Sequence, residues 1–328
     1  MRVRRGSVIA LLAVVSAAIS VLGGAARGQK ELTIAVIPKG TTHEFWKSIH
    51  AGAVKASREL GVEIIWKGPT KEEDREQQIK VVENFIARGV DGIVLAPLDD
   101  RALVPAVRDA VARNIPVVII DSGLKYDDYV SFVATDNYKG GVLGARHLGK
   151  LLGGTGKVIL LRCHEGSAST TLREAGFLDT LAKEFPDIEV VSSNQYGGAS
   201  TELAYKKSEG LLLRFPEVDG IFCPNESTTF GMLLALRSVG RAGKVKFVGF
   251  DSSDKLAKAL RAGEIHGLVL QHPFDMCYTA VKTMVQHLRG RKVKKRIDTG
   301  CEVITPDNMD QPRQKELLTP DLSKWLEN

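Results

Sequence analysis

A short motif occurs twice in this chain, once in each half. Residues 90–97 read VDGIVLAP, and residues 218–224 read VDGIFCP. Further along, Ile120-Asp121-Ser122-Gly123 corresponds to Phe250-Asp251-Ser252-Ser253, so an aspartate follows the start of the motif by 31 residues in the first half and by 33 in the second. An internal repeat of this regularity predicts two lobes of similar architecture.

From residue 31 onward, short apolar runs rich in valine and isoleucine alternate with amphipathic stretches of helical period. This alternation is typical of an α/β fold with doubly wound parallel sheets. In the first half we expect strands at 32–37, 62–66, 92–96, 117–121 and 130–134, and helices near 44–59, 72–88 and 101–113. In the second half we expect strands at 158–163, 188–192, 220–223, 245–250 and 267–270.

No Pro/Ser-rich linker separates the two halves. The expected boundary is Ala134-Thr135-Asp136-Asn137, after which Gly140, Gly141 and Gly144 open a helix that can pack closely against a sheet. The final third of the chain is interpreted as additional crossings between the lobes, which gives three hinge crossovers. The predicted lobes are therefore residues 29–135 plus 272–300 and residues 136–271 plus 301–328.

The composition, with 328 residues of which 44% are hydrophobic and 26% charged, is that of a globular protein with about two domains. The net charge is +6, but four arginines and no acid fall in residues 1–28, which leaves +2 for the rest. That surplus is too small to predict nucleic-acid binding.

The four cysteines form no C-x-x-C pair and are interpreted as mostly small buried hydrophobes. Cys163 and Cys223 are expected at the ends of adjacent strands, but the sequence alone does not predict a disulfide between them, because disulfide geometry is restrictive.

The first 28 residues have the three parts of a secretory signal peptide. A basic start at 1–5 is followed by an apolar run at 8–22 and by small residues at 24–28. The apolar run is shorter than the ~20 residues that a membrane-spanning helix needs. We therefore expect cleavage near residues 26–28 and a soluble, periplasmic mature protein.

Polar side chains follow the expected strands in both halves. In open α/β sheets, ligands bind beyond the carboxyl ends of the strands. Asp121 and Ser122 occupy such ends in the first half, and Asn225, Asp251 and Gln271 do so in the second. Carboxylates, amides and hydroxyls are the donors and acceptors that a polyhydroxylated ligand requires. The sequence thus predicts a polar cleft between the lobes.

Further charged residues stand near these strand ends. They are expected at the solvated rim of the cleft rather than in direct contact with the ligand: Lys39, Glu44, Glu165 and Glu226.

Aromatic side chains follow the first strand, in the stretch Thr42-His43-Glu44-Phe45-Trp46. Aromatic rings can pack on the apolar C–H faces of a sugar. We expect Phe45 or Trp46 to contact the ligand. The alternative is that Phe45 belongs to the core while Trp46 only covers the start of the helix.

Three other chemical interpretations of residues in this chain have less support than ligand binding. Asp121 and Asp251 could be the paired carboxylates of a glycosidase, but binding explains them and lobes that move do not hold a fixed separation. The stretch 153–157, GGTGK, lacks the spacing of a phosphate loop and precedes a strand. The run Cys163-His164-Glu165 has no second group of ligands beside it. We expect no enzymatic activity, no metal and no cofactor.

The run from Ile34 to Val269 resembles the type I periplasmic sugar-binding proteins, the ribose-binding family that shares its fold with the lactose-repressor core. The matching pieces are residues 42–46, 89–93, 115–121, 134–137 with Gly140-Gly141, 173–177, 248–251 and Gln271. Repressors of this fold carry a DNA-binding motif ahead of the core, where this chain has a signal peptide. The resemblance therefore implies binding without DNA.

The resemblance also implies roles for single residues. The family's aromatic sandwich falls on Phe45 and Trp46, and its hydroxyl-binding carboxylates and amides fall on the strand-end residues named above. Its polar ligand in the first loop falls on His43, where relatives often have Asn. Ser122 and Thr171 stand where sugar binders often have arginine, and Arg173 matches a structural arginine. These departures argue against ribose itself.

The resemblance implies an exported monomer that captures a sugar or polyol by hinge closure and delivers it to an ABC permease in the inner membrane. The alternatives are a ligand-sensing role for a chemoreceptor or sensor kinase and, less favoured, an extracellular glycosidase.

Overall fold

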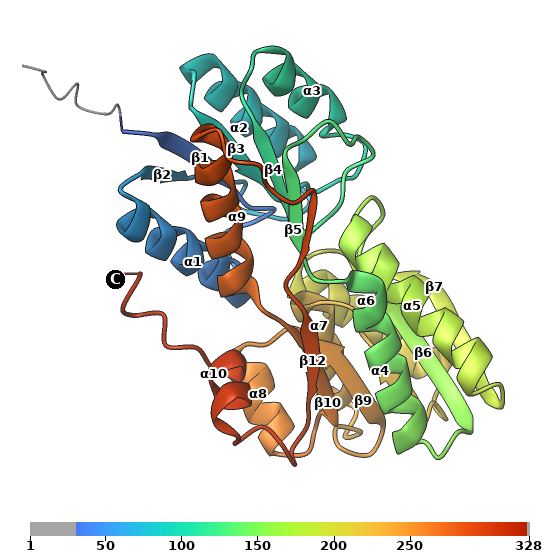
Figure 1. Ribbon diagram of the computed structural model, residues 1–328. Coiled ribbons are helices and arrows are strands. Elements are labelled where there is room, and N and C mark those ends of the chain that lie inside the picture. Colours follow the sequence, from blue (N-terminus) through green and yellow to red (C-terminus); the bar gives the residue numbers. More distant parts are fainter. Residues whose placement is uncertain (1–30, 327–328) are drawn as a thin grey trace, which may run out of the picture. The chain divides into compact units, whose positions relative to one another are not determined.

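The structure is a computed structural model that describes residues 31–326; the expected signal peptide lies outside these residues. From Leu32 onward the described residues belong to one compact unit that contains two six-stranded sheets (Figure 1). The first sheet has the order β11-β5-β4-β3-β1-β2, and the second has the order β12-β10-β9-β8-β6-β7. We call each sheet with its packed helices a lobe.

The strands of the first sheet are β1 (Thr33–Ile37), β2 (Glu63–Trp66), β3 (Gly92–Leu95), β4 (Val117–Ile120), β5 (Ser131–Ala134) and β11 (Arg296–Asp298). Those of the second are β6 (Gly156–Arg162), β7 (Ile188–Tyr196), β8 (Gly220–Phe222), β9 (Lys246–Phe250), β10 (Gly267–Gln271) and β12 (Cys301–Ile304). All neighbours pair in parallel except β12, which is antiparallel to β10. The predicted α/β class with two parallel sheets is confirmed.

The helices of the first lobe are α1 (Glu44–Leu60), α2 (Arg75–Arg88), α3 (Val104–Ala112) and α9 (Pro273–Leu288). Those of the second are α4 (Asn137–Leu151), α5 (Ala168–Glu184), α6 (Thr201–Arg214), α7 (Glu226–Ser238), α8 (Asp254–Arg261) and α10 (Pro312–Leu318). The expected helix at 72–88 begins only at Arg75, because the Asp74 side chain caps it by accepting from the backbone N–H of Gln77.

The chain passes between the sheets three times: between β5 and α4, between β10 and α9, and between β11 and β12. These passages are the three predicted crossovers. They attach each lobe at several points, which is the arrangement that permits hinge motion about a shared axis.

The glycines at the start of α4 permit the close packing expected from the sequence. A Cβ atom on Gly144 would lie 2.5 Å from the Phe222 ring, on the sheet. A Cβ on Gly141 would lie 1.9 Å from the carbonyl oxygen of Arg173, on α5. The glycines on this side of α4 therefore allow α5 to pack at a distance that a side chain would prevent.

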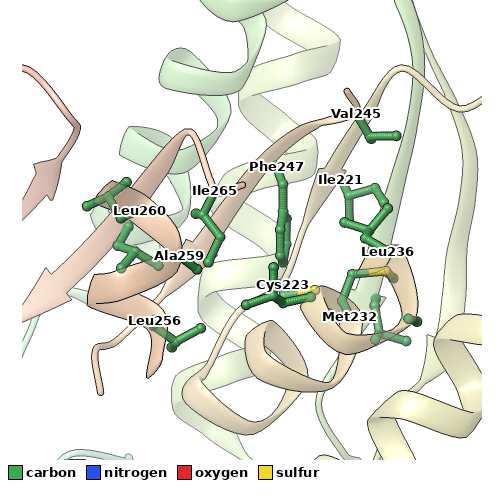
Figure 2. Close-up of a cluster of buried hydrophobic side chains, with 14 of the residues drawn as sticks. Ile221, Cys223, Met232, Leu236, Val245, Phe247, Leu256, Ala259, Leu260 and Ile265 are labelled. Carbon is green, nitrogen blue, oxygen red and sulfur yellow. The ribbon is translucent and has the colours of Figure 1, made fainter. Parts of the chain in front are cut away.

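One of the two apolar clusters of the second lobe lies between its sheet and the helices α7 and α8 (Figure 2). Phe247 and Cys223 lie at its centre, with Met232 and Leu256 from the two helices beside them. Burial raises the pKa of the Cys223 thiol well above its usual value, which keeps it unreactive. All four cysteines are free, and three of them are buried.

The C-terminal segment connects the lobes beside the hinge. Ser252 Oγ donates to the carbonyl oxygen of Leu318 at 2.7 Å, which holds the end of α10 in the second lobe. The chain then runs toward α1 (Figure 1), where the Trp325 ring lies 5.5 Å from the Arg58 guanidinium and 6.0 Å from the Phe274 ring.

Candidate ligand-binding site

The two repeated aspartates occupy equivalent and unusual backbone positions. Asp121 follows β4 with φ 58°, and Asp251 follows β9 with φ 64°. Positive φ is uncommon outside glycine, and Asp and Asn tolerate it best. Each aspartate is the first residue after its strand, at the carboxyl edge of its sheet. Both side chains line one cavity.

This cavity lies between the lobes and contains about 360 Å³ of space not filled by protein atoms, part of it open to solvent. Of the predicted site residues, it brings together His43, Phe45, Trp46, Asp121, Asn225, Asp251 and Gln271. It adds Lys39, Glu72, Cys163, Ser167, Ser169, Thr170, Arg173 and Glu226. The convergence of residues from both sheets is the central feature of the site.

Two predicted residues do not line the cavity. Ser122 is fully buried, and its hydroxyl accepts a hydrogen bond from the backbone N–H of Ser169 at 3.1 Å. Thr171 is exposed on α5, while the preceding Thr170 lines the cavity. Neighbouring residues of a helix point about 100° apart. A shift of one residue in matching this chain to the family therefore moves the predicted site residue to another face of the helix.

A buried ion pair lies on the first-lobe side of the cavity. Lys39 Nζ is 2.7 Å from Asp121 Oδ2, and it also donates to Ser169 Oγ at 3.1 Å across the cleft. Both charged side chains are almost fully buried. The sequence predicts Lys39 at the solvated rim of the cleft. The structure instead buries it in the cleft, where it contacts Asp121 of its own lobe and Ser169 of the opposite lobe.

Arg173 lies between the two aspartates. Its Nη2 is 3.9 Å from Asp121 Oδ1 and its Nη1 is 3.7 Å from Asp251 Oδ2. Nε donates to Asn137 Oδ1 at 2.8 Å, and the guanidinium lies 4.0 Å from the centroid of the Phe250 ring. Nη2 is buried and has no hydrogen-bond partner. The role implied by the resemblance was structural; the structure shows that this side chain also lines the cavity.

Gln271 presents a complementary unpaired atom. Its Nε2 donates to Asp251 Oδ1 at 2.7 Å, whereas its Oε1 is buried without a hydrogen-bond partner. Arg173 with an unpaired donor and Gln271 with an unpaired acceptor are therefore both lining residues of the same cavity. Buried polar atoms are normally satisfied, and a ligand hydroxyl can both donate and accept.

Asn225 is already engaged by its own helix. Its Oδ1 accepts from the Thr228 hydroxyl at 2.5 Å, and its Nδ2 donates to Ser227 Oγ at 2.9 Å. The side chain thus caps α7. One of the two N–H groups of Nδ2 remains for a ligand.

The first loop forms a network around Glu72, a residue that the sequence analysis missed. Glu72 Oε1 is 2.7 Å from His43 Nδ1 and accepts from the Trp46 indole N–H. Burial opposes both charges, but the hydrogen bond and charge of the partner prevail, raising the pKa of His43 to about 9 and lowering that of Glu72 to about 2. Trp46 and Phe45 pack in the core and also line the cavity; their contact with a ligand stays a prediction.

Glu226 is the first residue of α7, and its Oε2 accepts from the backbone N–H of Phe45 at 3.3 Å, across the cleft. Burial raises the pKa of Glu226 to about 7, against the opposing effects of the His43 charge and the Phe45 N–H. Its strand-end position had marked it in the sequence only as a rim residue.

Within residues 31–326 there is no group of three or more His, Cys, Asp or Glu side chains able to hold a metal ion. No helix in the same range has both the length and the apolar character needed to cross a membrane.

A model of the periplasmic binding protein domain matches residues 34–292. The D-ribose/D-allose-binding protein of Pseudomonas aeruginosa is 31% identical to this chain over 249 residues, covering 71% of this chain and 76% of that protein. Among solved structures, a carbohydrate transporter solute-binding protein of Agrobacterium radiobacter in complex with D-arabinose aligns with a TM-score of 0.86 and 33% identity, over 89% of this chain and 100% of that one. A solute-binding protein of an ABC transporter of Agrobacterium vitis with bound D-fucose aligns with a TM-score of 0.84 and 35% identity, over 88% and 100%.

The resemblance seen in the sequence is thus confirmed by an independent family match and by the two-sheet architecture. The chain belongs to the periplasmic binding protein domain family.

Proposed function

We propose that this protein captures a sugar or polyol between its lobes and delivers it to an ABC import permease. The observation that carries the proposal is that two residues lining one cavity each have a buried polar atom without a partner, Arg173 Nη2 and Gln271 Oε1. Such atoms are costly unless a ligand satisfies them. Relatives of this chain include a D-ribose/D-allose-binding protein and solute-binding proteins in complex with D-arabinose or with D-fucose, which supports a carbohydrate as the ligand.

Closure follows from contacts across the cleft. The lobes already meet where Lys39 donates to Ser169 and where the Phe45 N–H donates to Glu226. A ligand that touches both walls binds the closed form better than the open one, and this difference in affinity shifts the population toward closure. A permease can then distinguish loaded from empty protein by shape.

Export and the absence of catalysis complete the proposal. We infer that residues 1–28 are removed on export and that the protein acts in the periplasm. Lys39 lies beside the Asp121 carboxylate, and Arg173 lies between the two aspartates. This arrangement is suited to orienting the two carboxylates as hydrogen-bond acceptors for a ligand. A glycosidase acid needs instead a proton to transfer.

The test combines a thermal-shift screen with small-angle scattering. D-ribose, D-allose, D-arabinose, D-fucose and xylitol are added to wild type, to Asp251→Asn and to the control Glu165→Gln, whose carboxylate is exposed at the same edge and does not line the cavity. We expect stabilisation and compaction of wild type and control by at least one sugar or polyol, and a strongly reduced effect in Asp251→Asn. Stabilisation without compaction, or equal binding by Asp251→Asn, would contradict the proposal.

A further inference from the structure

The positive charges of the cavity all have carboxylate partners. Lys39 pairs with Asp121 at 2.7 Å, and His43 pairs with Glu72 at 2.7 Å. Arg173 is shared between Asp121 and Asp251, at 3.9 and 3.7 Å. On the first-lobe wall the charges therefore balance.

The second-lobe wall has one carboxylate more than its cations can match. Glu226 has no Lys, Arg or His nitrogen within 4.0 Å among residues 31–326, and its side chain accepts a single hydrogen bond there, from the Phe45 N–H. The closest cation to Asp251 is Arg173, which Asp251 shares with Asp121. An ionised carboxylate facing a mostly buried cavity is stabilised only by a positive charge or by several donors.

Gln271 points to a ligand at this wall independently of the charges. It is 2% exposed, and its Oε1 has no hydrogen-bond partner. Asp251 joins it to Glu226, because Asp251 accepts from Gln271 Nε2 at 2.7 Å and interacts with the backbone N–H of Glu226. Three adjoining side chains thus offer acceptor atoms to the cavity with too few donors to fill them.

Resting on the proposed function, we propose that the preferred ligand is an amino sugar, whose protonated amino group binds among Glu226, Asp251 and Gln271 Oε1. An ammonium group has three N–H donors and no acceptor, and it carries the charge that this wall lacks. The hydroxyls of the same sugar supply the acceptor for Arg173 Nη2. A neutral sugar offers one donor per hydroxyl and leaves the ionised form of Glu226 without a matching charge, while an acidic sugar adds a like charge.

Calorimetric titration at pH 7.5 tests the proposal with matched sugars. D-glucosamine, D-galactosamine, D-mannosamine and 1-amino-1-deoxy-D-glucitol are each compared with the parent compound that carries a hydroxyl in place of the amino group, and the three hexosamines also with their N-acetyl forms. We expect at least one amino compound to bind at least about tenfold more tightly than its parent and its acetylated form, as a charged hydrogen bond implies.

Glu226→Gln locates the preference. This variant keeps the side-chain size and removes the charge, so we expect it to lose the amino preference and to bind an amino sugar and its neutral parent with similar affinity. Glu165→Gln, which alters an exposed carboxylate of the same lobe, is expected to keep the preference.

The outcomes separate the two proposals. Neutral parents that bind as tightly as every amino compound would overturn the amino-sugar inference and leave sugar binding intact. An amino preference that persists in Glu226→Gln would overturn the assigned position. Failure of all carbohydrates, neutral and amino, to bind wild type would overturn the proposed function as well. The comparison of ligands on wild type holds even where a variant folds poorly.

Discussion

The Lys39–Asp121 pair allows a quantitative prediction for Asp121→Asn. The substitution keeps the side-chain shape, and asparagine tolerates the positive φ of this position. It leaves the Lys39 ammonium, 3% exposed, without its carboxylate. Breaking a buried pair from one side costs about 3–5 kcal/mol.

Urea unfolding at pH 7 measures this loss. We expect Asp121→Asn to lower the free energy of unfolding by about 3–5 kcal/mol. The double variant Lys39→Met with Asp121→Asn removes both charges, and we expect it to recover most of the loss. Asp109→Asn, which breaks an exposed pair with Arg113 on α3, is the matched control and is expected to cost under about 1 kcal/mol. A loss of the same small size for Asp121→Asn, or a double variant no more stable than the single one, would refute the reasoning.

Further predictions concern the C-terminal segment, a buried acid and a helix contact. Trp325→Ala removes the ring that this segment packs against the first lobe, so we expect a loss of about 1–2 kcal/mol in urea and faster proteolysis after α10; unchanged cleavage would count against it. Burial raises the pKa of Glu174 to about 7, so its protonated form stabilises the fold below pH 4.5, and this contribution is lost as pH rises through 7. Between pH 4.5 and 7 the unfolding free energy of Glu174→Gln should therefore fall less than that of wild type. An equal fall in the two proteins would contradict the assignment. Gly141→Ala places a Cβ 1.9 Å from the Arg173 carbonyl oxygen, so we expect the free energy of unfolding to fall by at least about 2 kcal/mol and sugar binding to weaken. Gly210→Ala, which has open space around it, should be neutral or stabilising. Similar melting temperatures for the two variants would exclude the packing argument.

The repeat in the sequence predicted the part of the site that the sheets determine. Asp121 and Asp251 follow corresponding strands of the two sheets, and parallel strands place their carboxyl ends at one edge of each sheet, so the fold places each aspartate at a ligand-binding edge. The structure adds that the two edges face one cavity. Gln271 ends β10 and could be placed for the same reason.

The residues that were missed depend on the paths of loops. Glu72 lies in the loop before α2, where no strand end marks its position, and only the folded loop brings it to His43 and Trp46. Lys39 was visible at a strand end, but its burial follows from the contact with Ser169 on the opposite lobe. Periodicity describes one element at a time, so it carries no information on contacts between the lobes.

The most direct test of the binding site is a crystal structure of the protein with the tightest carbohydrate found in the screens. We expect the ligand between the lobes, with an oxygen accepting from Arg173 Nη2 and a donor directed at Gln271 Oε1. A carbohydrate bound elsewhere, with these two atoms still unpaired, would contradict the account.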